Sequence, residues 1–76
     1  MKSIIAENVR NIINQKGLKQ RAVAMKAGYS LQTFNNMLNG RKIVSDVDVA
    51  NIAIALNVPV SLLFEEKTEE KELQEV

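Results

Sequence analysis

Residues 20–40, QRAVAMKAGYSLQTFNNMLNG, hold two short apolar repeats separated by a glycine. Apolar side chains recur at helical spacing on both sides of that glycine, at Val23, Ala24, Ala27, Phe34, Met37 and Leu38. Gly28 readily takes the left-handed conformation that ends one helix and turns the chain toward the next. The pattern predicts two short helices, over about 19–27 and 31–39, joined by a tight corner.

Polar residues occupy the positions between the apolar residues of the second of these helices. They are uncharged side chains that donate and accept hydrogen bonds, namely Ser30, Gln32, Thr33, Asn35 and Asn36. Such groups can recognise the edges of bases without the indiscriminate attraction of a charge. The alternative is a helix face that is merely polar and solvated.

The remainder of the chain predicts three further helices. The first covers about 3–16, where apolar residues form one stripe. Another begins at Ser45, with Asp48 as its capping-box partner, and ends at Asn57. Pro59 suits the first turn of a short last helix, and no segment shows the alternation of a strand. We therefore expect a compact all-α fold of five short helices.

Composition limits the chemistry that this chain can perform. Its 76 residues fit one small domain and include no cysteine and no histidine. These absences argue against a disulfide, a thiolate metal site and the commonest general base, so we expect no cofactor, no metal site and no enzymatic activity. Asp46 and Asp48 are paired acids, but at a helix start they are typical capping residues.

The N-terminal segment bears on where the protein resides. It has no long apolar run, which argues against a secretory signal or a membrane span. The lack of cysteine is compatible with a reducing cytoplasm. We expect a cytoplasmic protein that is associated with the nucleoid when it is bound to DNA.

Charge divides the chain into two parts. Residues 1–64 carry eight Lys and Arg against three Asp and Glu, whereas residues 65–76 carry two Lys against six Glu. We expect a domain over 1–64 and an acidic tail over 65–76, either a helical extension or disordered. A basic body attracts a polyanion, although two solvated surfaces of opposite sign would give the same counts.

The joint spacing of these residues resembles the Cro/C1-type, XRE-like helix-turn-helix domains of phage repressors. The matching features are Gln20, Ala24, Gly28, Ser30, the Asn-Gly-Arg-Lys run over 39–42 and the closing segment 55–64. The resemblance covers about residues 5–64. It implies a lambda-repressor-like fold in which the second and third helices form the helix-turn-helix and the third reads double-stranded DNA.

The chain departs from this family's usual pattern at four positions. Lys19 replaces the Ser or Thr that commonly caps the second helix, and Pro59 replaces a small capping hydroxyl. Ile13 and Ile54 are apolar where charged residues are frequent. A thicker core, scattered surface apolar residues or a surface for self-association would explain the two isoleucines.

The third helix is the expected reader of bases. The candidates for base contact are Leu31, Gln32, Thr33, Asn36, Ser30 and Asn35. Gln32 and Asn36 lie one turn apart, and each can form a bidentate contact with adenine. Because no Arg or Lys lies between Tyr29 and Asn39, the strongest guanine readers are missing. We expect half-sites that favour A·T pairs.

Separate residues are expected to hold the DNA backbone. The candidates for phosphate contact are Gln20, Lys19, Arg21, Asn39, Arg41 and Lys42. Gln20 lies at a helix start, where backbone N–H groups favour an anion. The resemblance places the residues from Asn39 to Lys42 against the backbone on the other side.

A single recognition helix covers only a few base pairs, so we expect a homodimer that reads two half-sites. The candidates for the dimer contact are apolar residues late in the chain that we expect to be exposed, namely Ile54, Val58, Val60 and Leu62.

The sequence therefore favours a sequence-specific transcriptional regulator, most simply a small prokaryotic or phage repressor that binds an operator as a dimer. The alternative is an antitoxin or other protein-interaction module of the same fold. In that case the acidic tail would bind a partner protein, although a solubilising end explains the same composition.

Overall fold

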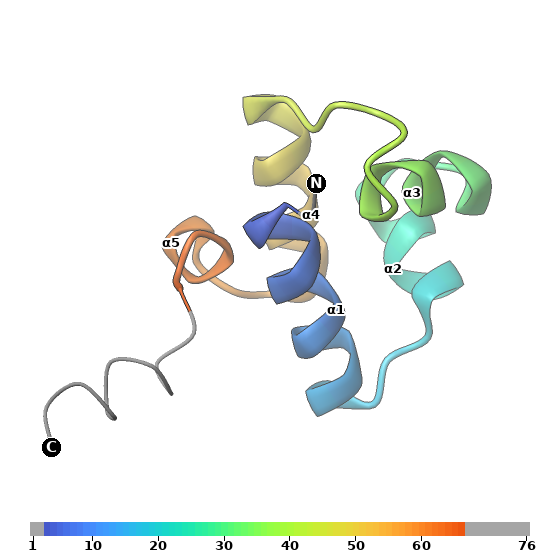
Figure 1. Cartoon of the computed structure of the whole chain (residues 1–76). Helices are drawn as coiled ribbons and strands as arrows, with labels where there is room; N and C mark the ends of the chain where they lie inside the picture. The colour runs from blue at the N-terminus through green and yellow to red at the C-terminus, as the bar shows by residue number, and fades with distance from the viewer. Residues whose placement is uncertain (1–2, 67–76) are drawn as a thin grey trace, which may run out of the picture.

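The five expected helices are present, and the capping residues mark their ends. The computed structural model describes residues 3–66 and contains α1 (Ile4–Lys16), α2 (Gln20–Ala27), α3 (Leu31–Leu38), α4 (Asp46–Leu56) and α5 (Val60–Leu63) (Figure 1). No strand occurs within this range. The predicted all-α architecture, with the helix-turn-helix formed by α2 and α3, is confirmed.

Side chains satisfy the backbone N–H groups at the starts of three helices. Ser3 and Ser30 accept hydrogen bonds in the first turns of α1 and α3. At α4 the backbone N–H of Asp48 donates to Ser45 Oγ at 3.2 Å, and the N–H of Ser45 donates to the Asp48 carboxylate at 3.0 Å. This is the predicted capping box, and Asn57 ends α4 in the left-handed conformation with a φ of 60°.

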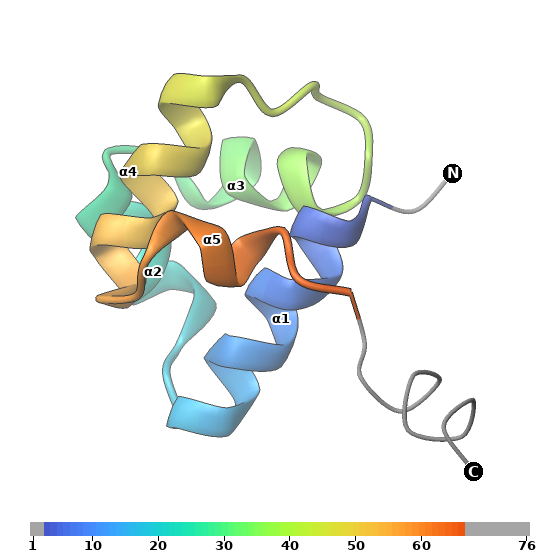
Figure 2. The same cartoon turned by 90° about the vertical axis from the view of Figure 1, so that its left-hand side faces the viewer.

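One hydrophobic core joins all the described helices. Its largest fully buried side chains are Phe34, Met37, Ile52, Leu56, Leu63 and Val9. α2 packs against α3 and α4, and α1 packs against α3, α4 and α5. In Figure 1, α5 lies on the opposite side of α1 from α2 and α3, and Figure 2 shows α5 between α4 and α1. The recognition helix and α5 therefore face different sides of the molecule.

A side-chain clasp holds the end of α5 against α1. Asn8 Nδ2 donates to the backbone carbonyls of Leu63 at 2.8 Å and Glu65 at 2.7 Å. A helix of four residues is too short to be stable by itself, so α5 depends on such tertiary contacts. Leu63 supplies the apolar part of this docking, since it is fully buried.

Ile13 and Ile54, the two isoleucines at positions where the family often has charged residues, differ in burial. Ile13 is 7% exposed and belongs to the core, whereas Ile54 is 74% exposed. The thicker core thus accounts for Ile13 but not for Ile54. Phe64 directly follows the last residue of α5 and is 51% exposed, unlike the buried Leu63 before it.

The acidic tail can be followed only at its start. Glu65 and Glu66 are exposed and irregular. The expectation that the tail extends the last helix or is disordered, and that it binds a partner, falls on residues 67–76, which lie outside the described range.

Candidate nucleic-acid interface

The corner between α2 and α3 fixes the direction of the recognition helix. Gly28 has a φ of 92°, and the backbone N–H of Tyr29 donates to the Ala24 carbonyl at 2.8 Å. Ser30 Oγ then accepts the N–H of Thr33 at 3.1 Å and donates to Thr33 Oγ1 at 3.0 Å. These bonds close the end of α2 and start α3 across the three residues 28–30.

The six candidates for base contact lie on α3 or at its cap, with different exposure. Gln32 and Ser30 are exposed, whereas Leu31, Thr33, Asn35 and Asn36 are half-buried. Gln32 therefore presents the most accessible amide of the helix. Ser30 and Thr33 already bond to each other, so their hydroxyls have less capacity for a base than the amides have.

The structure brings together two residues for which the sequence gives separate roles. Gln20 Nε2, at the start of α2, donates a hydrogen bond to Asn35 Oδ1 on α3. The bond takes one lone pair of the Asn35 oxygen and fixes the direction in which the Asn35 amide N–H groups donate. Gln20 consequently orients a candidate base-contact residue in addition to its predicted place beside a phosphate.

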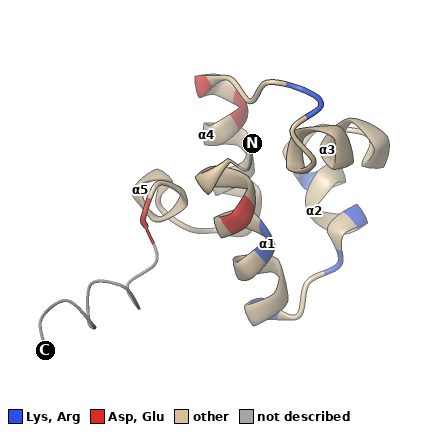
Figure 3. Ribbon diagram, viewed as in Figure 1, with Lys and Arg blue, Asp and Glu red and all other residues tan. Residues whose placement is uncertain are grey.

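Basic residues flank the recognition helix on both sides. Lys19 and Arg21 are exposed at the start of α2, and Arg41 and Lys42 are exposed in the loop after α3. Figure 3 shows blue segments around α2 and α3 and also in α1, while acidic segments lie in α1, at the start of α4 and beyond α5. This arrangement suits a helix that enters a groove between two phosphate backbones.

The first turn of α2 lacks a side-chain cap. Lys19 occupies the N-cap position in an extended conformation and makes no capping hydrogen bond with its side chain. Lys19 stands where the family commonly has a capping Ser or Thr, and no side chain takes over that role. The N–H groups that a Ser or Thr would have taken remain directed out of the helix start.

A polar network connects the corner of the motif to α4. Tyr29 Oη donates to Asp48 Oδ1 at 2.5 Å, and Asn51 Nδ2 donates to Tyr29 Oη at 3.4 Å. The hydrogen bond from Tyr29, followed by the one from the Ser45 backbone, lowers the pKa of Asp48. Burial and the same bond raise the pKa of Tyr29. The capping acid of α4 thereby also anchors the residue before Ser30.

Arg10 also reaches the recognition helix, although its sequence context gives no signal of this. Its guanidinium, on α1, donates to Asn39 Oδ1 at 2.7 Å. Apolar spacing within one helix cannot show which polar residues of two helices meet. For the same reason, the sequence does not predict the hydrogen bond between Tyr29 and Asp48.

The candidates for the dimer contact do not share one environment. Ile54 is 74% exposed and Val60 is 42% exposed. Val58 and Leu62 are half-buried against the core, which corrects the expectation that all four are exposed. The turn at Asn57 and the docking of α5 direct these two side chains inward. Phe64, which the sequence does not single out, is more exposed than Val60.

The described residues show no grouping typical of a metal centre. Residues 3–66 hold no cluster of three or more His, Cys, Asp or Glu side chains. A bilayer-spanning helix would need more apolar length than any described helix has.

Comparison with known proteins agrees with this geometry. A family model described as a helix-turn-helix domain matches residues 5–64, which include all five helices except the first residue of α1. No curated protein and no solved structure matches the chain. The matched family lies in the Cro/C1-type, XRE-like group, and it is typically non-catalytic. The chain belongs to this family of helix-turn-helix domains, whose membership indicates DNA binding.

Proposed function

We propose that this protein is a sequence-specific transcriptional regulator that represses by occupying an operator as a homodimer. The observation that carries the proposal is the row of uncharged polar side chains on α3, flanked by exposed basic residues at the start of α2 and after α3. Neutral amides supply selectivity, while the cations supply attraction to the phosphates.

Base readout is assigned mainly to the two amides one turn apart on α3. Gln32 is exposed, and Asn36 follows it on the same face of the helix. Each bidentate contact with adenine would provide about 1–3 kcal/mol of discrimination. Leu31, Thr33, Ser30 and Asn35 complete the surface, with Leu31 suited to thymine methyl groups. We propose half-sites that favour A·T pairs.

Backbone contacts are assigned to both flanks of α3. Gln20, Lys19 and Arg21 lie at the uncapped start of α2, where the helix dipole favours an anion. On the other flank are residues that follow the C-terminal end of α3, namely Asn39, Arg41 and Lys42. Two anchored flanks would fix the depth and register of α3 in the major groove.

The homodimer is assigned to the exposed apolar residues Ile54, Val60 and Phe64. All three side chains are exposed, and they lie on α4, on α5 and directly after α5. Burial of this surface between two copies would place two recognition helices about 10 base pairs apart, or a multiple of that.

Selection of bound sequences from a random DNA pool at physiological salt tests the whole proposal. We expect an A·T-rich, palindromic site with two half-sites at one helical repeat. A Gln32→Ala and Asn36→Ala double variant should lose the sequence preference while it retains weak binding to any duplex. Equal affinity of the native protein for every sequence would contradict the proposal, and guanine-rich half-sites would contradict the base assignment.

The proposed regulator acts in the cytoplasm, without a cofactor or catalysis. The competing function, an antitoxin that binds a partner protein through its acidic tail, depends on residues beyond the described range. Co-purification of a stoichiometric basic protein would favour that function, whereas specific DNA binding by the isolated chain favours the regulator.

A further inference from the structure

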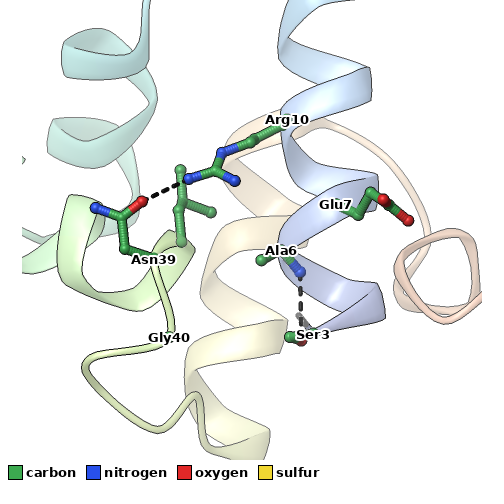
Figure 4. Close-up of a pocket in the computed structure, with 7 residues that line it drawn as sticks. Ser3, Ala6, Glu7, Arg10, Asn39 and Gly40 are labelled. Atoms are coloured by element: carbon green, nitrogen blue, oxygen red, sulfur yellow. Dashed lines mark hydrogen bonds between the residues drawn. The ribbon is translucent and has the colours of Figure 1, made fainter. Parts of the chain in front are cut away.

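The first turns of α1 meet the end of α3 around a pocket of about 400 Å³. Figure 4 shows this pocket, in which Arg10 extends from α1 toward Asn39 and Glu7 projects away from Asn39. The lining residues are Ser3, Ala6, Glu7, Arg10, Leu38, Asn39 and Gly40. The pocket thus joins a helix outside the helix-turn-helix to the end of the recognition helix.

The bond between Arg10 and Asn39 sets the orientation of the asparagine amide. Arg10 Nη2 donates to Asn39 Oδ1 at 2.7 Å, and the Asn39 amide nitrogen points away from Arg10 in Figure 4. Both residues are exposed. One guanidinium N–H is used in this bond, and the planar group carries four more donors.

The backbone at this end of α3 has its own partners. The N–H of Asn39 donates to the Asn35 carbonyl at 2.9 Å, and the N–H groups of Arg41 and Lys42 both donate to the Asn36 carbonyl, at 2.9 and 3.1 Å. These backbone donors are already satisfied within the turn. An anion at this end must therefore be bound by side chains.

We propose that Arg10 and Asn39 form one phosphate clamp, which extends the DNA interface from the helix-turn-helix onto α1. Arg10 holds the Asn39 oxygen and thereby fixes the direction of the Asn39 amide N–H groups, so that this amide and the remaining guanidinium donors both bind the phosphate backbone at this end of α3. The planar fork of arginine suits this double task, because lysine offers a point charge without fixed donor directions. The inference rests on the proposed DNA-binding function and assigns it a residue outside the recognition motif.

A double-mutant cycle on DNA affinity tests the clamp, using the full chain and the site returned by selection. Arg10→Ala should weaken binding about tenfold, as expected for loss of a charge-assisted hydrogen bond. It should also reduce the slope of log affinity against log salt by about one unit. Asn39→Ala should weaken binding several-fold without changing the slope, because the amide carries no charge.

Coupling between the two residues separates the clamp from two independent contacts. The double variant should bind more tightly than the product of the single losses predicts, because each residue depends on the other. Arg10→Lys should keep the native salt slope but bind several-fold more weakly. Lys16→Ala, which removes another exposed cation from α1 at its far end, serves as the matched control and should leave both affinity and slope unchanged.

Arg10 could instead be only a structural brace between α1 and α3. In that case Arg10→Ala would lower the thermal unfolding temperature and the affinity but leave the salt slope at its native value, and the proposal would be overturned. Arg10→Gln gives a second variant that keeps a hydrogen-bond donor to Asn39, and its salt slope should fall as for alanine. If the native protein binds a specific site and the slope is unchanged in both variants, only the clamp fails. If the native protein shows no specific site, the proposed function fails as well.

Discussion

At Gly28 the backbone conformation, and not crowding, determines which residue can occupy the corner of the motif. Its φ is 92°, yet a Cβ atom built at this position would meet no atom within 4 Å. Gly28→Ala should therefore destabilise the fold by about 1 kcal/mol through backbone strain alone. Gly28→Asn should cost less, since asparagine tolerates this region better. Chemical denaturation measures both, and equal stability of the alanine variant would contradict this reason.

Tyr29 and Asp48 give the stability of the fold a dependence on pH. Because the pKa of Asp48 is lowered, its ionised form stabilises the fold above its ordinary pKa, and this stabilisation is lost as pH falls through the lowered value. The pKa of Tyr29 is raised, so its contribution is lost only as pH rises through a value above 10.0.

Tyr29→Phe should therefore reduce stability by about 1 kcal/mol at neutral pH, at the low end for a bond to a charge because both residues are partly exposed. It should also flatten the loss of stability below about pH 4. Denaturant unfolding at a series of pH values measures both effects. An acid limb as steep as that of the native protein would show that the hydrogen bond does not set the pKa of Asp48.

Local signals predicted single residues well where the cause is local. Ser45 and Asp48 form the capping box that their spacing indicates, and Asn57 adopts the left-handed end. The bonds Arg10–Asn39 and Tyr29–Asp48 join residues that are distant in sequence, and no spacing rule connects them. They follow from how the helices pack, which the sequence alone does not specify.

Among the elements, the start of α2 lacks a side-chain cap, and the same N–H groups are proposed to bind a DNA phosphate. Lys19→Ser should stabilise the free protein by about 1 kcal/mol, because the hydroxyl would cap the N–H groups of the first turn. The same hydroxyl would compete with a phosphate for these donors. Lys19→Ala removes the charge without adding a cap and is the matched control.

The Lys19→Ser variant should unfold at a higher temperature than the Lys19→Ala variant. It should also bind DNA more weakly than the Lys19→Ala variant binds it. Calorimetry and titration of one operator duplex at fixed salt compare the two. Equal affinity of the serine and alanine variants would remove these backbone donors from the proposed interface.

Helix positions were predictable because apolar spacing and caps agree along most of the chain. The extent of α5 was less predictable, because its four residues depend on the burial of Leu63 and on the hydrogen bonds from Asn8. The directions of Val58 and Leu62 were also beyond the sequence, since the turn at Asn57 and the docked position of α5 turn them toward the core. Tertiary contacts decide the environment of side chains in so short a helix.

Over the whole molecule, the proposed dimer residues Ile54 and Val60 lie on other helices than the polar row of α3, so self-association and DNA contact can be separated by mutation. Ile54→Glu should prevent dimerisation while it leaves the fold intact, because an exposed substitution changes stability by no more than about 0.5 kcal/mol. Analytical ultracentrifugation without DNA should show a dimer for the native protein and a monomer for the variant.

Ile43→Glu is the control for this experiment, since Ile43 is 89% exposed in the loop between α3 and α4. We expect this variant to remain dimeric. A native protein that sediments as a monomer, both free and on DNA, would contradict the homodimer.

The bond between Gln20 and Asn35 has a consequence for any attempt to retarget this protein. A transplanted α3 would bring a new residue at position 35 to a glutamine whose amide donates to Asn35 in the native protein. The altered specificity would then depend on a side chain outside the exchanged segment. Engineering of new operators must therefore vary positions 20 and 35 as a pair, and a library confined to α3 would sample only part of the attainable recognition code.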